Sequence, residues 1–229
     1  MRTGRVLAAA VALGLVAGGQ AWALDNVSVT KHNLSLNTNA IYQTNTQEVC
    51  VFCHTPHGAS PDAPLWNRAM PAGPFTMYSS PTIDMVVAGS PQGVSLACLS
   101  CHDGTIALDA LRNTPGSGTT WAGFPTGNPP SAGYTFFGAG VGNVFPSGKI
   151  SNLGQDLRDD HPISVTYDPT KDPAFQTIAS VTAAGLRFYG MAKDQVECAS
   201  CHNPHDSTNG MFLRKANAGS ALCTTCHIK

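Results

Sequence analysis

All eight cysteines of this 229-residue chain occur in pairs with two residues between them, and a histidine directly follows each pair. Cys-x-x-Cys-His is the attachment site of c-type haem, because two thiols at this spacing reach the two vinyl groups on one edge of the macrocycle and the adjacent imidazole binds the iron. The sequence therefore predicts four covalently bound haem c groups, at motifs numbered 1 to 4 in chain order. The motifs are Cys50-Cys53-His54, Cys98-Cys101-His102, Cys198-Cys201-His202 and Cys223-Cys226-His227.

The remaining histidines match in number the ligands that four irons still need. The chain has eight histidines, and four of them lie outside the motifs: His32, His57, His161 and His205. Since four irons have eight axial positions, the count predicts that two histidines hold each iron. The alternative is that one of these four is an ordinary surface histidine and that a methionine binds its iron, which would raise the reduction potential of that haem. The candidate methionines are Met70, Met77, Met85, Met191 and Met211.

Other uses of paired cysteines explain the pattern less well. Two Cys-x-x-Cys pairs can form a zinc site, and eight cysteines in an exported chain can form a disulfide scaffold. Neither arrangement requires a histidine directly after the second cysteine of every pair. The sequence therefore favours haem over zinc and over disulfides.

Two of the additional histidines follow a motif at a very short distance. His57 lies three residues after His54, and His205 lies three residues after His202. Three residues span roughly 10 Å when fully extended, which is too short to round a macrocycle and reach the opposite face of the same iron. Each of these histidines must therefore bind a second haem close to the first, so that the chain forms closely stacked haem pairs.

The simplest assignment of these ligands follows the order of the chain. It gives His57 to motif 2 and His205 to motif 4. His32 then completes motif 1, and His161 completes motif 3.

The N-terminal segment predicts export. Residues 1–23 combine two arginines, an apolar stretch and Ala21-Trp22-Ala23, which is a small-x-small cleavage site. We expect a signal peptide and a protein that passes through the periplasm to the cell surface or outside the cell. Loss of two of the 13 basic residues against 14 acidic ones changes the formal charge from −1 to −3, which argues against nucleic acid as a partner. No later segment is long enough to span a membrane.

The composition predicts little regular secondary structure. Charged residues make up only 12% of the chain, which also has 23 glycines and 16 prolines. We expect a multihaem cytochrome c fold made mostly of loops, with short helices around stacked haem pairs whose apolar faces supply the buried surface. The expected helices carry the motifs or precede the third pair, and they cover residues 48–54, 96–102, 196–202, 220–227 (with Ser220 as N-cap) and a segment from Asp172-Pro173 to Ala183.

The motifs also describe an internal repeat. Each copy has a lone histidine, then a Cys-x-x-Cys-His-x-Pro-His block, then a plain Cys-x-x-Cys-His motif. The predicted organisation is a first dihaem module at 24–112, a loop at 113–149 and a second dihaem module at 150–229. Residues 113–148 contain no charged residue but six aromatic ones, so we expect an ordered loop that packs on haem edges or is buried against another molecule.

At these residues the sequence resembles the multihaem cytochromes with doubled Cys-x-x-Cys-His motifs. More narrowly, it resembles the OmcE-type extracellular tetrahaem cytochromes that polymerise into conductive filaments. The resemblance runs through KHNLS (31–35), CVFCHTPHGAS (50–60), PLWNR (64–68), CLSCHDGT (98–105), DDHPISVTYD (159–168), CASCHNPHD (198–206) and the terminal LCTTCHIK. It implies subunits stacked so that their haems form one continuous chain, in which one iron can take its second histidine from the next subunit.

The ligand count favours electron transfer over catalysis, because an iron with two histidines has no open position for a substrate. Three hypotheses remain: a filament subunit that carries electrons away from the cell, a monomeric periplasmic shuttle or redox partner of a terminal reductase, and a multihaem oxidoreductase with one five-coordinate haem. We expect the filament, with other copies of this chain, redox partner cytochromes or an extracellular acceptor as partners. Motif 4 near the C-terminus, His32 on an N-terminal arm and the uncharged loop suit head-to-tail contacts, which do not close.

Overall fold

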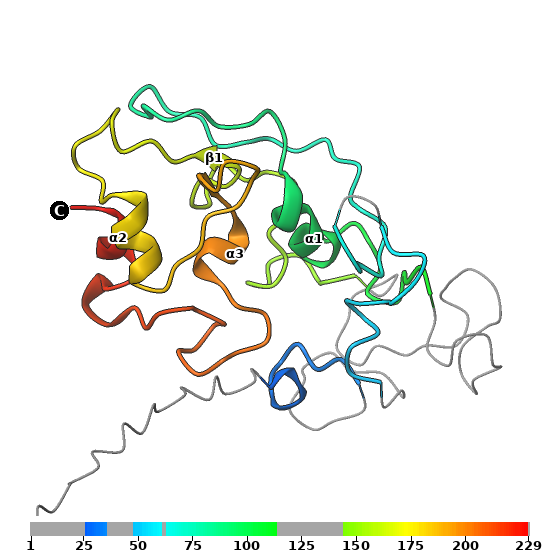
Figure 1. The fold of residues 1–229 in the computed structure, drawn as a ribbon. Helices are drawn as coiled ribbons and strands as arrows, with labels where there is room; N and C mark the ends of the chain where they lie inside the picture. The colour runs from blue at the N-terminus through cyan, green and yellow to red at the C-terminus, as the bar shows by residue number, and fades with distance from the viewer. Residues whose placement is uncertain (1–25, 36–47, 61–62, 114–143, 229) are drawn as a thin grey trace, which may run out of the picture.

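The computed structural model describes residues 26–35, 48–60, 63–113 and 144–228 (Figure 1). The expected signal peptide and residues 114–143 of the expected loop lie outside these described residues. Within the described ranges, none of the helices has the length and apolar character needed to cross a bilayer.

Turns and irregular segments make up most of the described chain, as the composition predicts (Figure 1). The longest helix has ten residues and the two strands have two residues each. In chain order the elements are η1 (Val27–Val29), α1 (Gly93–His102), β1 (Val165–Thr166), α2 (Ile178–Ala183), β2 (Gln195–Val196), α3 (Cys198–Cys201), η3 (Ala218–Ser220) and α4 (Cys223–Cys226).

The strands β1 and β2 form a two-stranded antiparallel sheet that leads directly into α3. Val165 pairs with Val196, and Thr166 pairs with Gln195. The two valines are buried in an apolar cluster, so the branched side chains on one face of the pair hold the sheet in place. The sheet thereby fixes the start of motif 3, two residues after Val196.

The helices expected at the motifs form to different extents. The helix expected at 96–102 is confirmed, since it lies within α1. The helices expected at 196–202 and 220–227 are shorter, at four residues each. The helix expected at 48–54 is wrong: the chain forms a turn there, with the His54 amide donating to the carbonyl of Cys50 at 2.8 Å. The turn ends because the next amide, that of Thr55, pairs with Leu65 instead.

Two expected helix starts are also wrong. Ser220 has a φ of 63° and lies in η3, whereas Leu222 is the N-cap of α4 and makes no side-chain cap bond. The helix expected from Asp172 begins only at Ile178, where the side chain of Thr177 accepts a hydrogen bond from Ser180 N at 3.2 Å. Asp172 accepts from the amide of Ala174 at 2.8 Å and so forms a local turn in place of a helix.

Two apolar clusters form the described core. One lies beside motifs 1 and 2 and the other beside motif 4. Phe145, from the expected uncharged loop, is buried in the first cluster and therefore packs within its own chain. The buried members are Leu34, Phe52, Leu108, Leu111 and Phe145 in the first cluster and Met85, Val165, Tyr167, Val181, Leu186 and Val196 in the second.

The two expected modules contact each other at several points. Helix α1 packs on α3, and Ser95 of α1 donates a hydrogen bond to the buried carboxylate of Glu197 at 2.5 Å. The ring of His32, from the first module, donates through Nδ1 to the carbonyl of Pro204 in the second at 3.0 Å. The expected boundaries stay a prediction, but the segments they separate are interleaved.

Candidate haem sites

The cysteine motifs fold as single turns that bring both thiols to one side. In motifs 1, 3 and 4 the amide of the motif histidine donates to the carbonyl of the first cysteine, at 2.8, 3.1 and 3.0 Å. Motif 2 lies in the last turn of α1. Residues three apart in such a turn share a face, which is the arrangement that bridging one macrocycle edge requires. All eight cysteines are free thiols, so none is held in a disulfide.

Three pairs of histidine rings face each other across gaps of nearly the same size. The ring centres of His54 and His205 are 6.1 Å apart. Those of His32 and His102 are 6.2 Å apart, and those of His161 and His227 are 6.4 Å apart. Each pair combines one motif histidine with one histidine from outside the motifs.

This spacing fits a metal ion bound between two imidazoles. A metal–nitrogen bond to histidine is about 2.0–2.1 Å long and the nitrogen lies about 1 Å from its ring centre, so opposite rings on one ion are about 6 Å apart. The donor set of two thiols and two imidazoles at each of motifs 1, 2 and 4 therefore fits a covalently attached haem whose iron has two histidine ligands.

The ring pairs in the structure differ from the expected ligand assignment. His205 faces motif 1 rather than motif 4, and His32 faces motif 2 rather than motif 1. His161 faces motif 4 rather than motif 3. These ring pairs do not follow the order of the chain, because α1 packs on α3 and brings together residues that are far apart in the sequence. The short tether predicts that His205 binds an iron other than that of His202, and the ring centre of His205 lies 6.1 Å from that of His54.

Backbone carbonyls orient four of the eight imidazoles. The Nδ1 atoms of His32, His102, His161 and His202 lie 3.0, 2.7, 3.0 and 2.9 Å from carbonyl oxygens of Pro204, Ser151, Pro162 and Met211, respectively. A carbonyl can only accept, so Nδ1 carries the proton in each ring and Nε2 keeps a free lone pair. This tautomer is the one that binds a metal through Nε2, and the second bond fixes the ring orientation.

Burial favours the neutral form of three of these rings. Desolvation lowers the pKa of His102 to about 4, and it also lowers the pKa of His32 and of His54. An imidazole must be neutral to donate its lone pair to a metal, so the fold holds these rings in the ligating form at neutral pH.

Motif 4 opens into a cavity of about 510 Å³. Its walls include both facing rings of this site, His161 and His227, and both thiols, Cys223 and Cys226. Phe175 packs against the ring of His227 with centres 4.5 Å apart and lines the same cavity. The volume lies within the range of about 300–1,000 Å³ that small-molecule sites occupy, so this cavity fits an apolar macrocycle held by motif 4.

Thiols of successive motifs lie close to one another. The thiol of Cys98 donates to the sulfur of Cys198, which raises the pKa of Cys98 and joins motif 2 to motif 3. Burial raises the pKa of Cys53 to about 12, and the neighbouring Cys101 adds to this effect between motifs 1 and 2. Burial likewise raises the pKa of Cys226 to about 11, with a smaller contribution from Cys201 of motif 3. The four motifs therefore form one contiguous run.

Two of the predicted histidine ligands, His57 and His202, do not face a second histidine ring in the described ranges. No imidazole in the described ranges faces His57 or His202 at the spacing of the other three pairs. Both side chains are exposed, and His202 nonetheless has the Nδ1 bond that prepares a ring for metal binding. Met211, a candidate methionine ligand, contacts His202 through this carbonyl, whereas its side chain is 65% exposed.

Aromatic residues at these sites were not singled out from the sequence. Phe212 stacks on the ring of His32 with centres 4.0 Å apart, and Trp66 meets His54 edge-on at 5.9 Å. The available signal was an aromatic residue at a similar distance after each block that ends in Pro-His. In the same described ranges no three or more His, Cys, Asp or Glu side chains are grouped to hold a metal ion.

Comparison with known families identifies a doubled CXXCH motif at residues 190–229. This match covers motifs 3 and 4 and points to a multihaem c-type cytochrome, in which CXXCH motifs hold covalently bound haem c. It indicates haem and metal binding and electron transport. A search of the curated proteins found no match.

Proposed function

We propose that this chain is an exported tetrahaem c-type cytochrome that works as the subunit of an extracellular filament and carries electrons along a row of bis-histidine haems. Each bound haem would take up and release one electron at its iron. The protein residues attach the haems, supply two imidazoles per iron and leave no position open for a substrate. The run of neighbouring motifs supports transfer from one site to the next.

The observation that carries the filament proposal is the unmatched pair His57 and His202. Three pairs of histidine rings form within one chain, whereas in the described residues the motif 3 ring His202 has its Nδ1 hydrogen bond but no facing imidazole. The second repeat already reaches back to the first, since His205 faces His54. The same relation continued by one repeat places His57 of a second copy opposite His202.

Such a contact is heterologous, because the chain offers His57 on one surface and receives a histidine at another. Heterologous contacts generate open polymers unless their rotation closes a ring. The described part of the N-terminal arm packs on its own chain. The ring of His32 donates a hydrogen bond to the carbonyl of Pro204 and stacks on Phe212 of the same chain. The neighbouring residues Asn33, Leu34 and Ser35 are buried.

The test is a comparison of native and His57→Ala protein by negative-stain imaging, size exclusion and spin-state spectroscopy. The native protein should form filaments with low-spin irons, whereas the variant should be monomeric with one high-spin iron per chain. Added imidazole should restore the low-spin signal of the variant but not its filaments, which separates ligand loss from assembly. Secretion is tested by intact mass, which should show cleavage after Ala23 and four haems.

Two other results would support the two alternative functions, the periplasmic shuttle and the oxidoreductase. A native protein that stays monomeric at high concentration with only low-spin irons would establish the periplasmic shuttle. A monomer whose motif 3 iron is high-spin and binds carbon monoxide would favour the multihaem oxidoreductase.

A further inference from the structure

The chain returns to motifs 1 and 3 through segments of the same geometry. The amide after the motif histidine pairs with a distant carbonyl in both cases, Thr55 with Leu65 at 2.9 Å and Asn203 with Phe212 at 2.7 Å. Leu65 and Phe212 both have positive φ, at 61° and 59°. Non-glycine residues rarely have a positive φ. Because both return segments have one at the same position, they are equivalent parts of the repeat.

The equivalence of the two return segments puts a basic residue at the same position in each repeat. The amide of Asn67 donates to Cys53 O in the first repeat, and that of Arg214 donates to Cys201 O in the second, at 2.9 and 2.8 Å. The next residues, Arg68 and Lys215, therefore occupy the same position in the two repeats.

Each of these cations contacts the same place in the motif that follows. Arg68 donates to the carbonyl of Ser100 at 3.1 Å, and Ser100 lies between the two cysteines of motif 2. Lys215 donates to Oγ1 of Thr225 at 2.9 Å, and Thr225 lies between the two cysteines of motif 4. Both contacted residues directly precede the second cysteine and are buried. The repeat thus places a positive charge against each plain Cys-x-x-Cys-His motif.

Arg68 is a fully buried charge, and most of its donors are already used. Its exposed fraction is 0%, and it also donates to the carbonyls of Leu108 and Ala107, both at 2.6 Å. The Arg158–Asp156 pair is the one salt bridge in the described part of the chain, so no carboxylate lies within 4.0 Å of Arg68. Four of its five N–H groups donate to carbonyls, and no ion pair in the described residues compensates its charge.

The charge of Arg68 lies directly against motif 2, because its guanidinium donates to the carbonyl of Ser100 between the two cysteines. Reduction adds one electron, and therefore one negative charge, to a haem site. A fixed positive charge in a poorly screened interior stabilises that added charge and raises the reduction potential.

We propose that Arg68 and Lys215 raise the reduction potentials of the haems at motifs 2 and 4. The inference rests on the haem sites of the proposed function but not on the filament. The step involves only the gain of one electron from a neighbouring site, and no bond forms or breaks. Arg68 and Lys215 act through charge and touch no reacting atom.

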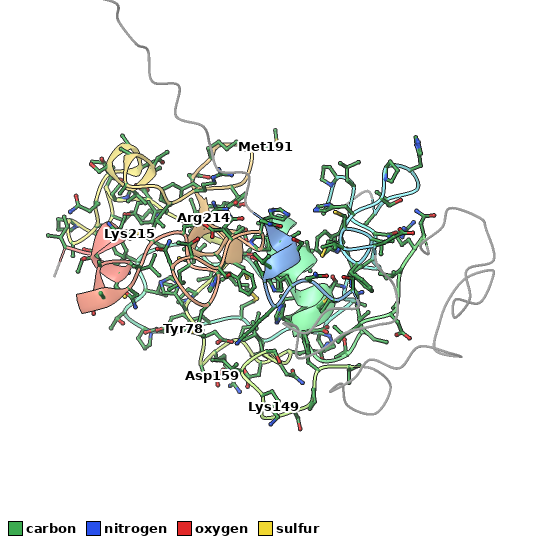
Figure 2. The ribbon with its side chains drawn as sticks, turned by 90° about the horizontal axis from the view of Figure 1, so that it is seen from below. Tyr78, Lys149, Asp159, Met191, Arg214 and Lys215 are labelled. Carbon is green, nitrogen blue, oxygen red and sulfur yellow. The ribbon has the colours of Figure 1, made fainter. Side chains whose placement is uncertain are left out.

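Lys215→Gln gives the decisive test. The side chain of Lys215 is half-buried and makes one hydrogen bond that glutamine can still donate, so the variant should fold and lose only the charge. Lys215→Arg keeps the charge. Lys149→Gln is the matched control, because Lys149 is exposed and lies away from the C-terminal helix beside which Figure 2 shows Lys215.

Spectroelectrochemical titration should show one haem shifted to lower potential in Lys215→Gln and none in Lys215→Arg or Lys149→Gln. A unit charge within about 10 Å changes the oxidised-to-reduced ratio by about tenfold, or about 59 mV. His161→Ala marks the motif 4 haem by its high-spin spectrum, and in that background the shifted haem should be the marked one. Arg68→Gln should shift the motif 2 haem in the same direction where the variant folds.

The inference is overturned if Lys215→Gln changes no potential by more than Lys149→Gln does, or if the shifted haem is not the marked one. Haem content and assembly are measured on the same samples. Four haems and filaments without a shift refute the inference and leave the proposed function standing. Monomers that show the shift refute the filament and leave the inference standing.

Discussion

Removal of His205 should expose the iron of motif 1 and no other. His205 is the ring that faces His54 at 6.1 Å, and it lies three residues after His202 of motif 3. His205→Ala therefore removes one of two axial ligands from one of four sites. About a quarter of the total haem should change from low-spin to high-spin relative to the parent protein, and about one carbon monoxide should bind per four haems.

The affected site is identified by removing single haems. In a Cys50→Ala/Cys53→Ala background, which lacks the motif 1 haem, His205→Ala should add no high-spin signal. In a Cys223→Ala/Cys226→Ala background, which lacks the motif 4 haem, the signal should persist. The opposite pattern would support the chain-order assignment of His205 to motif 4 and would show that the facing rings are not a ligand pair.

Three further substitutions test the supporting structure. Burial raises the pKa of Glu197, so the folded state loses stability as pH rises through that pKa and the carboxyl group ionises. In denaturant titrations Glu197→Gln should therefore have the same stability as the parent protein in acid and a higher stability at pH 7. A less stable variant at pH 7 would contradict this. Gly104→Ala should lower the free energy of unfolding by about 2–4 kcal/mol in thermal unfolding, because φ is +71° and the new methyl group would collide with Asn152. Gly148→Ala is the control: φ is +73° there but the space is open, so the loss should be only about 1–2 kcal/mol. Tyr167→Phe removes a hydroxyl group that donates to the carbonyl of Gln176 at 2.7 Å. It should lower the free energy of unfolding by about 1 kcal/mol, and structure should be lost first at motif 4. An unchanged Tm would contradict the role of this hydrogen bond.

The sequence predicted what depends on nearby residues and failed where distant segments meet. The spacing of the motifs predicted the turns that carry the thiols, and the short tether predicted that His205 serves a site other than that of its neighbour His202. It could not predict that His205 faces His54, because this pairing depends on how the two repeats pack. The helix expected at 48–54 failed for a similar reason, since Leu65 takes the amide that would have continued it.

The pattern of paired rings also bears on how copies of this chain would join. If two copies exchanged His57 reciprocally across a two-fold axis, both motif 3 sites would be filled and association would stop at a dimer. The pairing inside the chain runs in one direction instead. His205 reaches from the second repeat to motif 1, but His57 does not reach from the first repeat to motif 3. A relation that is not reciprocal between repeats of one chain is heterologous, and where it closes no ring its continuation between chains leaves one unpaired His57 and one unfilled motif 3 site after every addition. Measured length distributions should therefore be broad and depend on concentration, whereas a two-fold exchange would give a single dimeric species.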